Sequence, residues 1–115
     1  MANIEFDVTD RSDDLKVITI GGRLDATTAA EVRPKMIELA QGPTKFVLDL
    51  SKLEWIDSSG VGALVTLYKR ARTGGGDVKV AGLQRQPKEI FRLLRLEAAL
   101  ETFDTVDDAA AKLAG

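Results

Sequence analysis

The chain has 115 residues, of which 44% are hydrophobic, and this is enough for the core of one small domain. It carries 16 basic and 18 acidic residues, and the net charge of −2 gives no basic patch typical of proteins that bind nucleic acid or anionic membranes. It contains no histidine and no cysteine, which excludes Ser-His-Asp and Cys-His catalysis, disulfides and the commonest zinc sites. Any chemistry must therefore use carboxylates, hydroxyls, lysines or backbone groups.

The N-terminal residues lack the basic and then apolar order of a signal peptide, and no apolar run reaches the roughly 20 residues of a membrane span. We therefore expect a cytoplasmic protein that forms a single domain over residues 1–115.

Two strands are predicted at the N-terminus. Apolar residues alternate at Ile4, Phe6 and Val8, and a second alternating segment follows over residues 15–22 after a polar cluster, which is typical of a hairpin. The alternation in the second segment changes phase between Val17 and Ile18. Because this places apolar side chains on both faces, we expect the second strand to lie further inside the sheet than the first.

A first helix is predicted after the glycine pair at 21–22. Its apolar residues recur at helical spacing: Ala29, Val32, Met36 and Leu39. Thr28 and Glu31 fit a capping box, and Gly42 is a suitable end. Pro34 would remove one helical hydrogen bond, so this helix is expected either to be kinked or to start later than the capping box indicates.

Residues 44–50 form a short apolar segment bounded by turn residues, which predicts a strand buried in the middle of the sheet.

Residues 58–73 then form a helical pattern. Its predicted core stripe contains Val61, Leu64, Val65 and Tyr68. On the opposite side lie Gly62, Ala63, Thr66 and Leu67. This flat side is expected either to receive another protein or to be covered by a second helix of the domain.

The C-terminal part continues the alternation of strands and helices. We expect a strand over residues 77–83, a helix with Pro87 as its first residue, a short extended piece around residues 100–103, and a last helix capped by Thr105. The fold class is therefore α/β, with a mixed sheet of four to five strands, an N-terminal antiparallel hairpin and about four helices.

The start of the helix over residues 58–73 carries two adjacent serines. If Asp57 is the N-cap, its carboxylate accepts the amide hydrogen of Ser59 or Gly60, and Ser58 in the first turn keeps a free hydroxyl. In the alternative register Ser58 is the cap and Ser59 has the freer hydroxyl.

A helix N-terminus favours anions, and Gly60 and Gly62 leave this first turn little shielded. Three functions are therefore compatible with it: binding of a phosphate ligand, a nucleophilic serine, or a serine that receives a phosphoryl group. A nucleophile lacks a histidine base here, and a phosphate loop lacks the Gly-Lys-Ser/Thr motif. From these residues alone an ordinary helix cap is the favoured interpretation.

Residues 53–62, with the sequence LEWIDSSGVG, follow the FVLDL strand and resemble the signature of bacterial anti-sigma factor antagonists, which are small single-domain STAS proteins. The earlier GRLDATTA is similar to the Gly-x-Leu-Asp segment of that family, and GGGDVKVAGL fits its strand after a glycine turn. The resemblance extends from about Ile4 to Leu113 and implies a STAS-like sheet.

The resemblance implies a protein-binding switch that has no catalytic activity, cofactor or metal of its own and binds neither nucleic acid nor membrane directly. In this family the residue matching Ser58 is phosphorylated by the partner, an anti-sigma factor that is a serine kinase with the ATPase fold of histidine kinases. The unphosphorylated form binds this partner and releases the sigma factor, and a metal-dependent serine phosphatase restores the hydroxyl.

The residues expected at the partner surface are Asp25, Asp57, Ser59, Gly60, Gly62, Ala63 and Thr66. Two alternatives stay open: a non-switching STAS module of a signalling or transporter complex, and a small domain that binds phosphate or a nucleotide.

Overall fold

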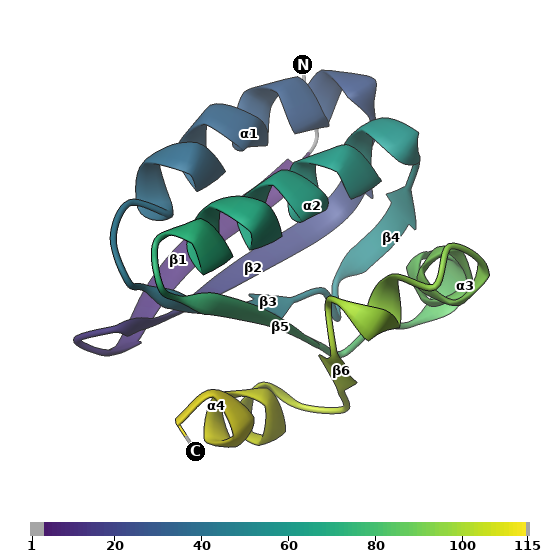
Figure 1. Ribbon diagram of the computed structural model, residues 1–115. Coiled ribbons are helices and arrows are strands. Elements are labelled where there is room, and N and C mark those ends of the chain that lie inside the picture. The colour runs from purple at the N-terminus through teal and green to yellow at the C-terminus, as the bar shows by residue number, and fades with distance from the viewer. Residues whose placement is uncertain (1–3, 115) are drawn as a thin grey trace.

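The described residues, 4–114, form a six-stranded sheet with four helices in the computed structural model (Figure 1). The strands are β1 (Ile4–Ser12), β2 (Leu15–Leu24), β3 (Lys45–Asp49), β4 (Leu53–Ile56), β5 (Asp77–Ala81) and β6 (Thr102–Phe103). The helices are α1 (Ala26–Leu39), α2 (Ser58–Thr73), α3 (Arg85–Leu93) and α4 (Val106–Ala114), with a 3₁₀ turn at Leu96–Ala98. No helix within this part of the chain combines the length and the apolar character needed to cross a membrane.

The strand order is β1-β2-β3-β5-β6, and β4 pairs with β2 outside this path. β1 is antiparallel to β2, whereas the other pairs are parallel. The mixed sheet with an N-terminal hairpin is thus confirmed. β4 was not predicted, because it has only four residues and two of them, Glu54 and Trp55, are exposed.

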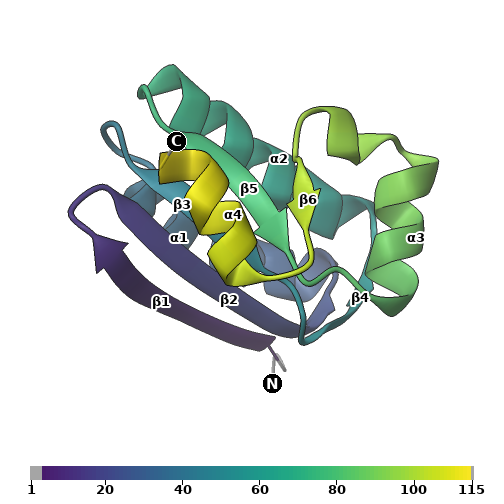
Figure 2. The same cartoon turned by 90° about the horizontal axis from the view of Figure 1, so that it is seen from below.

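The helices cover the two faces of the sheet unequally. α1 and α2 lie side by side on one face, α4 packs on the other, and α3 lies beside β4 (Figures 1 and 2). Ile18 and Ile20 pack under α1 and α2, whereas Leu15 and Val17 face α4. The change of phase in β2 therefore buries apolar side chains on both faces, as predicted.

Two helices begin at residues other than those predicted. α1 begins at Ala26 with Asp25 as its N-cap, and Asp25 and Thr28 form the capping box. The predicted box of Thr28 and Glu31 and the alternative of a later start are therefore both wrong, and Pro34 lies inside the helix on its exposed side. α3 begins at Arg85, so Pro87 is its third residue rather than its first. A proline fits there because backbone N–H groups in the first helical turn have no helical acceptor.

The buried side of α2 differs from the predicted stripe. Ala63, Leu64 and Leu67 are fully buried, while Val61 and Val65 are only half-buried. α2 packs against both the sheet and α1, so Ala63 and Leu67, which were expected on the side opposite the core, are part of the core. The prediction that Ala63 and Leu67 are open to a partner is therefore wrong.

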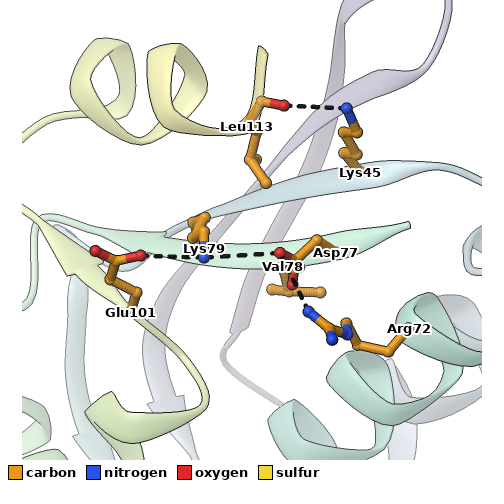
Figure 3. A network of polar contacts seen from close by, with 7 residues as sticks. All are labelled: Lys45, Arg72, Asp77, Val78, Lys79, Glu101 and Leu113. Carbon is orange, nitrogen blue, oxygen red and sulfur yellow. Dashed lines mark hydrogen bonds and ion pairs between the residues drawn. The ribbon is translucent and has the colours of Figure 1, made fainter. Parts of the chain in front are cut away.

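Polar contacts connect α4 and the residue before β6 to strands β3 and β5 (Figure 3). The Nζ atom of Lys45 donates to the carbonyl oxygen of Leu113 in the last turn of α4, at 3.0 Å. The ammonium group of Lys79 lies 3.1 Å from a carboxylate oxygen of Glu101 and 3.6 Å from one of Asp77. Lys45 and Asp77 begin the parallel strands β3 and β5, so this network lies away from the strand ends that lead into α1 and α2.

Candidate functional site

Two helices start from neighbouring strand ends. Leu24, the last residue of β2, pairs with Ile56, the last residue of β4, and the N–H of Asp57 donates to the carbonyl oxygen of Leu24 at 3.2 Å. Because α1 and α2 follow directly, their N-terminal ends meet at one edge of the molecule (Figure 1). Asp25 and Asp57 are therefore brought together beside Ser58.

Asp57 caps α2 in the register that leaves Ser58 free. Its carboxylate accepts the N–H of Gly60 at 3.0 Å, and its backbone is extended. Ser58 is thus the first helical residue and is exposed, while Ser59 is half-buried. Neither serine hydroxyl has a hydrogen-bond partner within residues 4–114. The first of the two predicted registers is confirmed, and the hydroxyl of Ser58 is not consumed by the fold.

Asp25 caps α1 with the same backbone conformation, φ −117° against −115° for Asp57. Its carboxylate accepts the N–H groups of Thr27 and Thr28, and the Thr28 hydroxyl accepts the N–H of Asp25 in return, at 2.9 Å. The N–H of Thr28 is the main cause that holds the pKa of the Asp25 carboxyl below its usual value, with smaller contributions from the Thr28 hydroxyl, Thr27 and Arg23. Asp25 is therefore a structural cap as well as a neighbour of Ser58.

Gly60 lets the first turn of α2 approach β2 closely. A Cβ atom at this position would lie 2.4 Å from the carbonyl oxygen of Leu24 and 2.7 Å from Cγ1 of Ile56. Gly60 is buried and its N–H is bound to Asp57, so we assign it to packing rather than to contact with a partner. The same applies to Ala63, which lies in the core.

Gln86 on α3 holds the strand end that leads into the site. Its side-chain oxygen accepts the N–H of Ile56 and its amide nitrogen donates to the carbonyl oxygen of Ile56, both at 2.9 Å. This side chain takes the place of a neighbouring strand, so the residue before Asp57 has both its backbone groups paired. No sequence pattern indicated this role, because Gln86 lies 30 residues further along the chain.

An arginine and a tryptophan flank the two helix starts. Arg23 is opposite Trp55 in the β2–β4 pairing, and its guanidinium carbon lies 5.0 Å from the centre of the Trp55 ring. Trp55 remains 37% exposed. Trp and Arg are the side chains most often found at the energetic centres of protein interfaces. The sequence indicates Trp55 only as part of the LEWIDSSGVG motif and does not predict its contact with Arg23.

The sequence matches the STAS domain over residues 6–109. The chain belongs to the STAS domain family. Its relatives include the anti-sigma-B factor antagonist of Bacillus subtilis, which is 29% identical over 99 residues covering 86% of this chain and 90% of the relative. The anti-sigma-F factor antagonist RsfB of Mycobacterium tuberculosis is 30% identical over 102 residues, which cover 86% of this chain and 81% of RsfB.

The solved structures agree with this assignment. The anti-sigma factor antagonist SpoIIAA in its unphosphorylated form matches this STAS domain with a TM-score of 0.82 and 20% identity, covering 96% of this chain and 97% of SpoIIAA. The phosphorylated form of SpoIIAA, from Bacillus, matches with a TM-score of 0.71 and 19% identity, covering 94% and 98% of the two chains. The family resemblance of residues 53–62 and the STAS-like fold are thus confirmed.

Proposed function

We propose that this STAS protein is an anti-sigma factor antagonist, which binds an anti-sigma factor when unphosphorylated and releases it when Ser58 is phosphorylated. The observation that carries the proposal is the exposed hydroxyl of Ser58, left free in the first turn of α2 because Asp57 makes the cap. The relatives named as antagonists of anti-sigma factors support the same role. In this role the chain is a substrate and a binding partner rather than a catalyst.

The phosphoryl transfer requires groups from the partner. Ser58 Oγ would attack the γ-phosphorus of ATP held by a serine kinase, the bond to ADP would break, and the hydroxyl proton would pass to a base. The chain has no histidine, and within residues 4–114 no carboxylate is hydrogen-bonded to Ser58, so we expect the kinase to supply the base. A metal-dependent serine phosphatase would reverse the change by transferring the phosphoryl group to water.

Phosphorylation would break an interface without unfolding the domain. A phosphoryl group adds about −1.5 to −2 charge beside Asp57 and Asp25. At a helix N-terminus, charge effects amount to about 0.3–2 kcal/mol and favour an anion. Like charges forced together across an interface cost several kcal/mol. The larger magnitude acts only on association, so we expect the fold to persist and the complex to dissociate.

The proposed docking surface surrounds the start of α2. It comprises the residues predicted from sequence that are not fully buried, Asp25, Asp57, Ser59, Gly62 and Thr66, together with Arg23 and Trp55. The exposed aromatic ring of Trp55 would supply the apolar centre and the two aspartates the charge. Ala63 and Gly60 are not part of this surface because the fold buries them.

The test is an in vitro phosphorylation and binding assay with serine kinases of the histidine-kinase-like ATPase fold from the same organism. Wild type and Ser59→Ala should incorporate phosphate from ATP, whereas Ser58→Ala should not and should still bind the kinase. Ser58→Asp should bind more weakly than wild type. Phosphate found by mass spectrometry only on Ser59 would contradict the assignment.

The same assay separates the alternatives. A partner bound equally by wild type and Ser58→Asp would indicate a STAS module that does not switch. Saturable binding of a nucleotide by the isolated chain at micromolar concentration would instead indicate a small nucleotide-binding domain.

A further inference from the structure

Arg33 on α1 reaches across to α2 at a glycine. Its Nη2 atom lies 3.3 Å from the position that a Cβ atom on Gly62 would occupy. Because Gly62 has no side chain, the guanidinium rests directly over the backbone of α2, and α1 and α2 lie side by side here (Figure 1).

Ser58 lies one helical turn before Gly62, on the same side of α2. Residues four apart on a helix have Cβ atoms about 5–6 Å from one another. The Nη2 atom of Arg33 lies 3.3 Å from the Cβ position of Gly62, so it lies no more than about 9 Å from the Cβ atom of the exposed Ser58.

Arg33 has no acidic partner in the described part of the chain. None of the ion pairs within residues 4–114 includes it, and none of the side-chain hydrogen bonds there does. Other cations nearby are engaged with aromatic rings, Arg23 with Trp55 and Lys35 with Phe6. An unpaired guanidinium has the planar pair of donors that matches a phosphate group.

We propose that Arg33 is the intramolecular receptor for the phosphoryl group on Ser58. The inference rests on the proposed function, because it takes Ser58 as the residue that is modified. Held by Arg33, the phosphate would lie along α2 over Gly62 and toward the gap between the two helices. The phosphate would then lie on the docking surface between Ser58 and Gly62, and the partner would be released because the phosphate occupies space and adds charge where the partner binds.

The test uses protein in which phosphoserine is incorporated at position 58 during translation, so that no kinase is required. The second pKa of the phosphate, about 6 in a free phosphoserine, is followed by ³¹P NMR against pH. A neighbouring guanidinium favours the dianion, so Arg33→Gln should raise this pKa by about half a unit or more relative to the wild-type sequence.

Lys35→Gln is the matched control. It removes one positive charge from the same helix, but two residues along α1 from Arg33 and next to Phe6, which places it away from α2. It should leave the phosphate pKa nearly unchanged. Gly62→Leu places a side chain where the guanidinium of Arg33 lies and should displace it. This variant should therefore shift the phosphate pKa in the same direction as Arg33→Gln.

Equal shifts from Arg33→Gln and Lys35→Gln, or no shift from Arg33→Gln, would overturn the proposal. The outcome is independent of the kinase assay. If no kinase modifies Ser58, the proposed function fails, but the titration still measures whether Arg33 binds the phosphate. If Arg33→Gln leaves the phosphate pKa unchanged, the role of Arg33 fails, but the kinase assay still tests the proposed function.

Discussion

Replacing Gly60 with alanine adds one methyl group, and its effect on stability should show whether close packing or helix propensity dominates at this position. In a helix, replacing glycine with alanine is favourable by about 1 kcal/mol. At Gly60, however, the added Cβ would lie 2.4 Å from the carbonyl oxygen of Leu24 and 2.7 Å from Cγ1 of Ile56. The carbonyl oxygen is a backbone atom and cannot rotate away, so the first turn of α2 must move.

The expected cost follows from these contacts. Overpacking a well-packed site costs about 1–3 kcal/mol. Moving α2 also weakens the hydrogen bond from Asp57 to Leu24, which adds about 0.5–1.5 kcal/mol. After the gain in propensity is subtracted, Gly60→Ala should destabilise the domain by about 0.5–3.5 kcal/mol. In a domain of 115 residues each kcal/mol lowers the melting temperature by roughly 4 °C.

Gly62→Ala is the matched control, two residues along the same helix. Its added Cβ would meet only the flexible end of Arg33, at 3.3 Å, so we expect no loss and a gain of up to about 1 kcal/mol. Urea unfolding followed by the fluorescence of Trp55, the single tryptophan, measures both variants. Equal stabilities for the two alanine variants would refute the reasoning that Gly60 is required by the approach of α2 to β2.

Two further predictions concern the residues that position the site. Gln86→Ala should leave both backbone groups of Ile56 without their partner and destabilise the domain by about 1–3 kcal/mol, whereas Gln84→Ala, which removes a side chain that makes no capping bond, should have little effect in the same urea assay. The pKa of Asp25 is lower in the folded protein than in the unfolded chain, where it is about 3.9. The charged carboxylate therefore stabilises the fold fully above about pH 3.9, and this stabilisation is lost as the pH falls through the lower folded pKa. Asp25→Asn should therefore lower the melting temperature at pH 7, and its difference from wild type should disappear in acid; a difference independent of pH would exclude a role for the charge.

The elements with strong local signals were predictable from sequence. The phase change between Val17 and Ile18 identified a strand buried on both faces, and Asp57 identified the start of α2 to the residue. In both cases the deciding interaction lies within a few residues of the signal: alternation in one strand, or a carboxylate three residues from the amide that it binds. Interactions between residues close in the sequence were therefore sufficient to predict these two features.

The remaining features depend on contacts between distant segments. Ala63 is buried because α1 packs beside α2, and a small residue gives no sign of this in a helical pattern. Gln86 and Arg33 have ordinary polar side chains that give no sign of a distant contact, and only the fold brings them to Ile56 and Gly62. The first-turn serine with the free hydroxyl could therefore be located from the sequence, but the residues around it from distant segments could not.

β2 has different parallel neighbours along its length. Residues 15–19 pair with β3, while residues 22–24 pair with the short strand β4. Displacement of β4 would break the second set of pairings and the two hydrogen bonds between Gln86 and Ile56, but not the pairings of β2 with β3. The hydrogen bonds between β2 and β3 therefore do not depend on β4, and the strand end that leads to Ser58 is joined to the sheet separately from the central pairings.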